Sequence, residues 1–192
     1  GFGRTGRWFA VEHWHVVPDI ITMAKGLTSG YVPLGAVGLR RSIADYFQTH
    51  VFGGGLTYNS HPVACAAALA ALGVLESDGL VENARRMGIV MAECHADLAR
   101  RHPSIGATRN IGLFGAIELI RDRATREPMA PFNASSAEMQ ELSAFFRREG
   151  LFTFVRSNYF FTNPPLSISE AQLREAFAII DRGLDLLDRA VR

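Results

Sequence analysis

The sequence predicts an α/β region followed by a smaller α+β lobe. Short β-branched apolar runs alternate with helix-forming runs, and this alternation is typical of domains that mix helices and sheet. Hydrophobic residues make up 48% of the 192 residues and charged residues 20%, so the chain can bury a core and is not disordered. This length corresponds to one or two domains. We place the expected boundary near His102, giving domains over 1–102 and 103–192.

The charge distribution narrows the function classes. The chain carries twenty basic and nineteen acidic residues, a net charge of +1, with no block of like charge, so it lacks the basic patch of a nucleic-acid or membrane-surface binder. Nineteen of the basic residues are arginine, and Lys25 is the only lysine. A function that needs a primary amine therefore has one side-chain candidate.

The N-terminal residues, the two cysteines and the apolar runs predict the cellular compartment of the protein. The chain begins at Gly1 without the layout of a signal peptide, and we expect it to be a fragment that starts inside a longer protein. No apolar run reaches the ~18–20 residues that span a bilayer. Cys65 and Cys94 form no CxxC motif, which favours two buried thiols over a disulfide. We therefore expect a cytoplasmic protein with no membrane contact.

Two short strands are predicted in the first half. The β-branched run 19–23 follows Pro18 and is typical of a short buried strand, and 34–39 is typical of a second one. The loop 25–33 lies between them. Two helices follow. Pro62 suits a first helical turn ahead of the alanine-rich run 63–76.

The second of these helices is longer and is expected over 80–101. We expect its apolar face to consist of Ile89, Val90, Ala96 and Leu98. The dipeptide His102-Pro103 should end it, because proline cannot continue a helix.

The second half alternates strands with capped helices. A strand is expected over 111–119. Ser135-x-x-Glu138 has the spacing of a capping box and predicts a helix start, and Gly150 suits the position just after that helix. Further strands are expected over 151–155 and 159–162.

A final helix should begin at the Ser169-x-x-Gln172 box. Its apolar residues recur at helical spacing and predict one buried face. They are Leu173, Phe177, Ile180, Leu184 and Leu187.

Lys25 is the first candidate for chemistry. It directly follows the predicted strand 19–23, so its amine would project at the end of a sheet, where open α/β folds bind ligands. In a dry pocket such an amine can act as a nucleophile and form a Schiff base. The alternative is a solvated surface lysine in an arginine-biased chain.

Two further candidates lie on either side of the predicted boundary. The Gly53-Gly54-Gly55 turn precedes a helix and is followed by Thr57, so free backbone N–H groups and a hydroxyl could bind a phosphate. Arg156 ends the predicted strand 151–155, and its guanidinium could bind a carboxylate through two parallel hydrogen bonds. An ordinary turn and a surface arginine are the alternatives.

Several motifs occur together in one order and spacing. They are Gly1-Phe2-Gly3-Arg4-Thr5-Gly6, Pro18-Asp19-Ile20-Ile21, Ala24-Lys25-Gly26-Leu27, Gly30-Tyr31-Val32-Pro33-Leu34-Gly35-Ala36, Thr57-Tyr58 and His61-Pro62-Val63-Ala64-Cys65-Ala66-Ala67. In this arrangement they resemble the class-III pyridoxal-phosphate-dependent aminotransferases, which handle ω-amino acids and amines. The resemblance covers essentially the whole chain and is strongest up to residue 76.

The resemblance implies a fold and a reaction. Residues 1–102 would be the carboxyl-terminal part of the cofactor-binding large domain of the aspartate-aminotransferase-like fold (PLP fold type I), with a linking helix, and 103–192 the small α+β domain. The full enzyme would move an amino group from an amine or amino acid to a keto acid such as pyruvate. Its cofactor would be pyridoxal 5'-phosphate, and it would be a homodimer whose subunits share the active site.

The resemblance also assigns roles to three residues. Lys25 would hold the cofactor as a Schiff base and transfer the substrate proton. Thr57 would reach the cofactor phosphate of the neighbouring subunit. Arg156 would bind substrate carboxylates, although its spacing to Pro164-Pro165 is shorter than in several relatives.

Part of the family's site is missing from this chain. The aspartate that pairs with the cofactor ring nitrogen lies upstream of the motif that begins at Gly1, and Asp19 matches a structural aspartate instead. One alternative is therefore a non-catalytic truncated fragment. Within the same fold, a PLP-dependent aminomutase or a decarboxylating enzyme is a second alternative, because the lysine and phosphate apparatus is shared.

Two other motif interpretations have weaker support. Gly1-x-Gly3-x-x-Gly6 fits a dinucleotide fingerprint, but no strand precedes it and the run 7–17 lacks helical apolar spacing. His13-x-His15 could form part of a metal site, but no third ligand has a recognisable spacing. We expect no resident metal.

Overall fold

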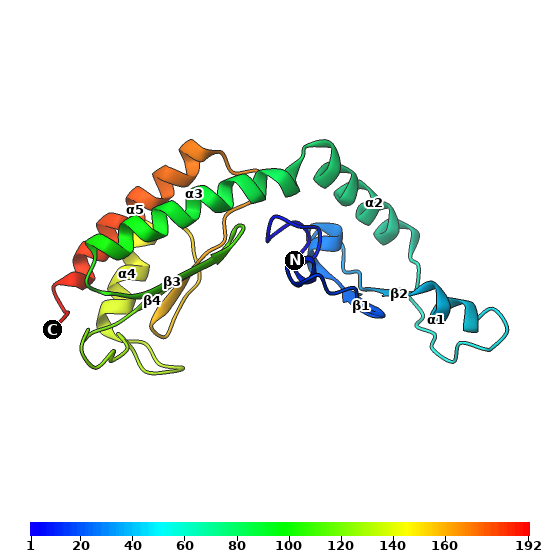
Figure 1. Cartoon of the computed structure of the whole chain (residues 1–192), viewed down its shortest axis with the longest axis horizontal. Helices are drawn as coiled ribbons and strands as arrows, with labels where there is room; N and C mark the ends of the chain where they lie inside the picture. Colours follow the sequence, from blue (N-terminus) through cyan, green and yellow to red (C-terminus); the bar gives the residue numbers. More distant parts are fainter. The chain divides into compact units, whose positions relative to one another are not determined.

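The computed structural model describes all 192 residues, which divide into two compact units (Figure 1). The first contains residues 1–3 and 7–81, and the second contains residues 4–6 and 82–192. The division therefore lies about twenty residues before the expected boundary at 102. The physical reason is the long helix before that boundary, since its buried residues Ala84, Met87, Met91 and Leu98 belong to the hydrophobic core of the second unit.

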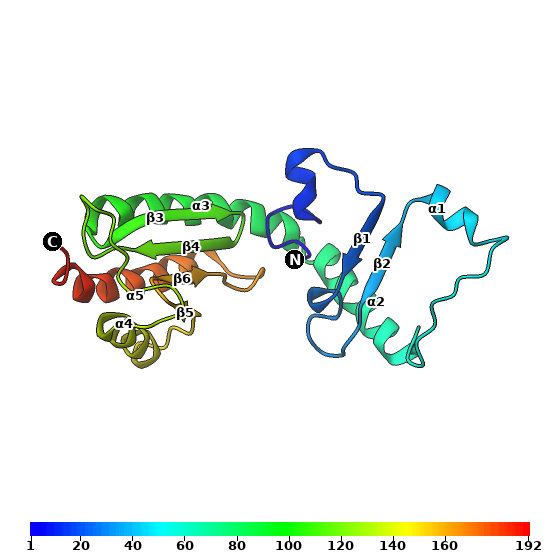
Figure 2. The same ribbon diagram turned by 90° about the horizontal axis from the view of Figure 1, so that it is seen from below.

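The first unit is built around two strands. Its elements are η1 (Ala10–Trp14), β1 (Ile20–Met23), η2 (Lys25–Thr28), β2 (Ala36–Leu39), α1 (Arg41–Tyr46) and α2 (Pro62–Ser77). β1 and β2 run antiparallel, with Ile20 opposite Leu39 and Met23 opposite Ala36 (Figure 2). Both strands and the proline-led helix are confirmed, with Pro62 in the first turn of α2.

The expected burial of these strands is wrong. Ile20 is 55% exposed and Leu39 is 40% exposed. The reason is that the sheet has two strands only, so each is an edge strand and neither has a second neighbour. The apolar side chains of β1 and β2 therefore stay accessible within this chain.

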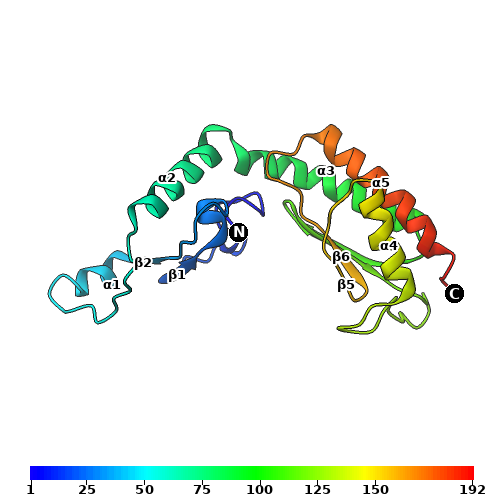
Figure 3. The ribbon, with the colours of Figure 1, turned by 180° about the vertical axis from the view of Figure 1, so that it is seen from behind.

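The second unit packs helices on an antiparallel sheet. Its elements are α3 (Leu80–Arg101), β3 (Ile105–Ile111), β4 (Phe114–Leu119), α4 (Ala137–Arg148), β5 (Val155–Arg156), β6 (Tyr159–Thr162) and α5 (Glu170–Asp188). The strand order is β3-β4-β6-β5. In Figures 1 and 3, α3 and α5 run along one face of this sheet. The core of the unit lies between these helices and the sheet.

Several sequence expectations for this unit are confirmed. The predicted helix 80–101 has the bounds of α3, and the predicted strand 159–162 has those of β6. α5 begins with the predicted capping box, in which Ser169 accepts a hydrogen bond from the backbone N–H of Gln172. All five predicted apolar positions of α5 are buried.

Other expectations are wrong in detail. The strand expected over 111–119 begins later, as β4 at Phe114, because Gly112 adopts a left-handed turn that joins it to β3. The strand expected over 151–155 is reduced to two residues, Val155–Arg156. α4 is capped by Ser136 rather than Ser135, with the Ser136 side chain accepting from Met139. Gly150 follows α4 with a φ of 80°, as expected for a residue that ends a helix.

The apolar face expected for α3 is confirmed at two of its four positions. Leu98 is 2% exposed and Val90 packs against the core, whereas Ile89 is 55% exposed and Ala96 is exposed. The buried residues of α3 are Ala84, Met87, Gly88, Met91, His95 and Leu98. This set recurs at spacings of three and four, and it includes a histidine that hydropathy alone does not mark.

The two cysteines form no disulfide, as the sequence predicts. Cys65 and Cys94 are free, and both are half-buried rather than buried. Burial raises the pKa of the Cys94 thiol.

No single helix is long and apolar enough to cross a membrane, and only α2 and α3 taken together have the length and composition for it.

Backbone contacts between glycines hold α3 close to the β3–β4 hairpin. A Cβ added at Gly88 would lie 2.5 Å from the Cα of Gly112. A Cβ added at Gly112 would lie 2.3 Å from the carbonyl carbon of Thr5. Because backbone atoms surround both positions, neither site has room for a side chain. The loop 4–6, the hairpin turn and α3 therefore form one close-packed stack within the second unit.

Gly88→Ala should destabilise the second unit. Alanine raises helix propensity by about 1 kcal/mol over glycine, but overpacking against backbone costs about 1–3 kcal/mol, and the backbone of Gly112 cannot give way as a side chain could. The matched control is Gly73→Ala in α2, where nothing lies within 4 Å of the added Cβ. Urea unfolding should give opposite signs for the two variants. Equal stabilisation of both would contradict the packing account.

His95 is a titratable group inside this core. It is 2% exposed, its Nε2 lies 3.0 Å from Thr162 Oγ1, and its Nδ1 has no hydrogen-bond partner. Burial lowers the pKa of His95 to about 4, because the charged imidazolium is poorly solvated there. The folded protein therefore keeps this ring neutral at pH values where an unfolded chain protonates it.

Lowering the pH should reduce the free energy of unfolding, because the folded and unfolded states differ in proton binding at His95. Between about pH 6.5 and pH 4 the unfolded state binds a proton that the folded state does not, so stability falls as the pH falls, by roughly 3 kcal/mol in all. In His95→Gln, which cannot protonate, this part of the pH dependence should be lost. Unfolding free energies of both proteins across this range test the point. Parallel curves would contradict a neutral buried His95.

Candidate functional site

Lys25 lies where β1 ends and the 3-10 turn η2 begins. Its φ is 51°, in the left-handed region that L-residues other than glycine, asparagine and aspartate seldom occupy. Such strained backbone persists only where the surrounding structure holds it, and it is frequent at functional sites. The Lys25 side chain is exposed, and its ammonium makes no hydrogen bond or ion pair. The chain's only lysine is thus presented with its Nζ free.

A hollow of 560 Å³ surrounds this lysine. Backbone and small apolar groups form most of its wall, and no carboxylate is among them. The lining residues are Ala24, Lys25, Thr28, Gly30, Val32, Pro33, Leu34 and Gly35. The Thr28 hydroxyl donates to the carbonyl oxygen of Val32, which closes the loop on itself. No acidic group of the wall competes for the lysine Nζ.

Thr57 lies in an exposed turn ahead of α2. The backbone N–H of Asn59 donates to the carbonyl oxygen of Leu56 at 3.0 Å, which closes the turn around Thr57. The Thr57 hydroxyl makes no hydrogen bond within the chain, and Thr57 does not line the hollow around Lys25. The structure therefore leaves this hydroxyl free without bringing it to the lysine.

Arg156 belongs to the second unit, in β5. Its Nη2 donates to Asn133 Oδ1 at 2.7 Å, and the Asn133 N–H donates to Ser157 Oγ at 2.9 Å. Asn133 and Ser157 both have left-handed backbone, with φ of 57° and 48°. These residues line a hollow of 360 Å³ together with Ala134, Ser135 and Val155. The guanidinium is exposed and makes no ion pair, so it is free to bind an anion.

Sequence reasoning missed Asn133 and Ser157. Asn133 is 23 residues from Arg156 along the chain, and no local pattern connects them. The one available signal was the tendency of asparagine to adopt left-handed backbone in loops. Lys25 and Thr57 lie in the first unit and Arg156 in the second.

Arg4 lies in the motif Gly1-Phe2-Gly3-Arg4-Thr5-Gly6 and has a structural role. Its carbonyl oxygen accepts from the Leu113 N–H at 3.0 Å, and its Nη1 donates to the carbonyl oxygens of Leu113, at 3.2 Å, and Pro164. Partial burial lowers the pKa of Arg4. With three main-chain contacts in the second unit, Arg4 ties the loop 4–6 to the hairpin turn.

A family model describes almost the entire chain. The model for aminotransferase class-III matches residues 1–184. The chain belongs to the class-III aminotransferase family. The resemblance predicted from the sequence motifs is thereby confirmed, and the cofactor of this family is pyridoxal phosphate. The dinucleotide interpretation is wrong, because Gly6 is followed by turns and the 3-10 helix η1 instead of an α-helix.

Two curated relatives illustrate the family. A probable 4-aminobutyrate aminotransferase of Bacillus subtilis is 35% identical over 187 residues, covering 96% of this chain and 41% of the relative. A putrescine–pyruvate aminotransferase of Pseudomonas aeruginosa is 35% identical over 198 residues, covering 100% of this chain and 41% of the relative. The chain thus spans about two fifths of the length of its family members.

Solved structures give the same assignment. Taurine:2-oxoglutarate aminotransferase from Bifidobacterium kashiwanohense, in complex with PLP and glutamate, matches with a TM-score of 0.91 and 38% identity, over 98% of this chain and 42% of that one. An S-selective transaminase from Arthrobacter sp. with alanine bound matches with a TM-score of 0.88 and 31% identity, over 98% and 42%. The predicted fold class, PLP fold type I, is confirmed.

Proposed function

We propose that this chain is part of a transaminase in which Lys25 binds the cofactor covalently. The enzyme moves an amino group from an amine or amino acid to a keto acid such as pyruvate. The observation that carries the proposal is the free Nζ of Lys25, presented by a left-handed residue beside a hollow without carboxylates. Related proteins named as taurine–pyruvate and putrescine–pyruvate aminotransferases support pyruvate as acceptor.

The residues present fit a pyridoxal phosphate site. When bound, this cofactor supplies the electron sink for the amino-group transfer. Lys25 Nζ would hold the cofactor by a covalent bond to its aldehyde carbon. The same Nζ, once free, would take up and return the proton of the donor carbon. The small, uncharged wall around Lys25 leaves its nitrogen without a competing ion pair.

Thr57 has a proposed role across a subunit boundary. Its hydroxyl is exposed, and this suits a donor to the cofactor phosphate of a neighbouring subunit in a homodimer. Hydroxyl groups and turn N–H groups are the donors that phosphates commonly bind. The free hydroxyl, and the absence of Thr57 from the wall of the lysine's hollow, both agree with a contact made outside this chain.

Arg156 is the proposed binding group for substrate carboxylates. Its guanidinium has one donor occupied by the amide oxygen of Asn133, and the remaining donors are free. A planar guanidinium matches a carboxylate through two parallel bonds. A neutral partner such as Asn133 positions the arginine without neutralising its charge.

A second proposal concerns the 192-residue chain by itself. The 192 residues by themselves are a non-catalytic piece, in line with their span of two fifths of the relatives. Activity is therefore proposed for the full gene product. Transamination by the isolated 192-residue chain would overturn this second proposal only.

Lys25→Ala in the full gene product should lose turnover with amine donors by at least about a hundredfold, the lower limit for a positioned acid–base group. Added methylamine should restore part of the rate, since a free amine can replace the missing proton carrier. Arg41→Ala, an exposed cation of the same unit, is the control and should keep full activity. Turnover of Lys25→Ala near that of the control would rule out the proposed role.

Arg156→Ala should separate substrates by charge. Loss of a charge-assisted contact is worth about 1.5–3 kcal/mol, so kcat/KM for carboxylate-bearing donors should fall about 10–100-fold. Simple amines should be spared. Arg109→Ala, an exposed arginine of β3 in the same sheet, controls for general charge loss. Equal losses for amines and amino acids would remove the proposed role of Arg156.

A further inference from the structure

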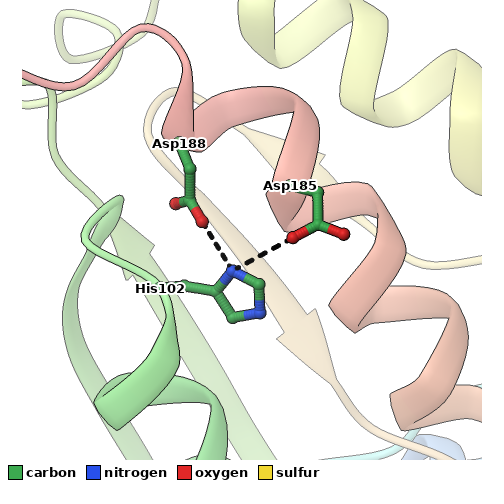
Figure 4. A group of neighbouring side chains, drawn as sticks. All are labelled: His102, Asp185 and Asp188. Carbon is green, nitrogen blue, oxygen red and sulfur yellow. Dashed lines mark hydrogen bonds and ion pairs between the residues drawn. The ribbon is translucent and has the colours of Figure 1, made fainter.

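A buried histidine and three aspartates meet where α3 ends, far along the chain from the lysine. His102 directly follows α3 and is 3% exposed. Its Nδ1 lies 2.7 Å from Asp188 Oδ2 and 4.0 Å from Asp185 Oδ1 (Figure 4), and its Nε2 lies 2.7 Å from Asp181 Oδ1. All three aspartates come from α5. The proposed transamination uses none of these groups.

Three of these residues hold possible metal-ligand atoms close to one another. One atom each from His102, Asp185 and Asp188 lies within 4.8 Å of the other two. Asp185 and Asp188 are three positions apart, so they share one face of α5. Figure 4 shows both carboxylates directed at the same side of the imidazole ring. Because α3 and α5 pack on the same core, this arrangement is held by the fold of the second unit.

Groups outside this trio fix the orientation of its members. Asp181 accepts from the far nitrogen of the ring, which leaves Nδ1 as the atom that faces the carboxylates. The Ser104 N–H and hydroxyl both donate to Asp188 Oδ1, at 3.1 and 2.6 Å, and so leave Asp188 Oδ2 directed at the ring. A histidine whose far nitrogen is held by a carboxylate is the usual arrangement behind a metal-binding imidazole.

The charges at this point favour a divalent cation. Arg101 forms an ion pair with Asp181, which offsets that carboxylate. Asp185 and Asp188 remain, with two negative charges facing one imidazole. A protonated ring would balance one of them, whereas a divalent cation on a neutral ring balances both.

We propose that His102 Nδ1, Asp185 and Asp188 bind Zn²⁺ or a similar borderline divalent cation. Imidazole with carboxylates suits zinc, whereas magnesium prefers oxygen ligands alone. The ion would lie between His102 Nδ1 and the carboxylate oxygens of Asp185 and Asp188. Water completes the tetrahedron. The site links the end of α3 to the end of α5.

The required movements are small. Bonds of about 2.0–2.1 Å in a tetrahedron place neighbouring ligand atoms roughly 3.3 Å apart. The 2.7 Å pair must therefore open and the 4.0 Å pair must close, each by less than an ångström or so. The oxygens of Asp185 and Asp188 lie within 4.8 Å of each other and must close by at most about 1.5 Å. The Asp185 side chain is 68% exposed, so it can rotate onto the ion and solvent can deliver the ion to the site.

The test uses the full gene product after chelator treatment and dialysis. Zn²⁺ is titrated into the protein by calorimetry, which reports its stoichiometry and affinity. The deciding variant is Asp185→Asn, because the Asp185 side chain is 68% exposed and its ion pair with His102, at 4.0 Å, is the longest of the three. Glu175→Gln removes one exposed charge from the same helix and is the matched control. His15→Gln controls for zinc bound by the surface pair His13 and His15.

We expect one Zn²⁺ per chain, and Asp185→Asn should weaken binding by more than about tenfold. Glu175→Gln and His15→Gln should keep this binding, and Co²⁺ at the site should give a tetrahedral absorption spectrum that Asp185→Asn lacks. Equal zinc affinity in Asp185→Asn and the parent would overturn the proposal. So would absence of zinc uptake, which would leave hydrogen bonds between His102 and the aspartates as the role of the cluster.

Discussion

The left-handed backbone at Lys25 determines where the chain's only side-chain amine lies. β1 ends at Met23, and a residue with φ of 51° turns the chain at once into η2. If Lys25 kept extended backbone, the loop that closes through Thr28 and Val32 could not fold back to form the wall of the hollow. The unstrained alternative for such a turn is glycine. A lysine is held there at a cost in backbone energy, as is frequent at functional sites.

The second unit depends on a different constraint, the close approach of main chains. Gly88, Gly112 and the loop at Thr5 meet without side chains between them, and this fixes α3 against the hairpin. α3 in turn places His95 inside the core and His102 opposite the aspartates of α5. Arg156 lies in the same antiparallel sheet. One packing arrangement thus positions the proposed carboxylate-binding arginine and the proposed metal site.

Local signals made much of this fold predictable. The capping box of Ser169 and Gln172 predicts the start of α5, and Pro103 predicts the end of α3. Both signals depend only on residues close together in the sequence. Features that depend on distant contacts were not predictable. Ile89 and Ala96 were misplaced because packing against the second unit decides which apolar residues of α3 are buried. The burial of β1 was misjudged because neighbouring strands decide it. For the candidate site, motif resemblance indicated Lys25, whereas the contact of Arg156 with Asn133 joins residues too far apart for any local pattern.

The covalent bond between cofactor and lysine is the central claim. The most direct measurement is borohydride reduction of the full gene product with pyridoxal phosphate, followed by peptide mapping. The account predicts one pyridoxyl group per chain, on the peptide that contains Lys25, and none on a lysine newly introduced by Arg41→Lys. Stoichiometric label on any other lysine of the gene product, with Lys25 unmodified, would contradict it.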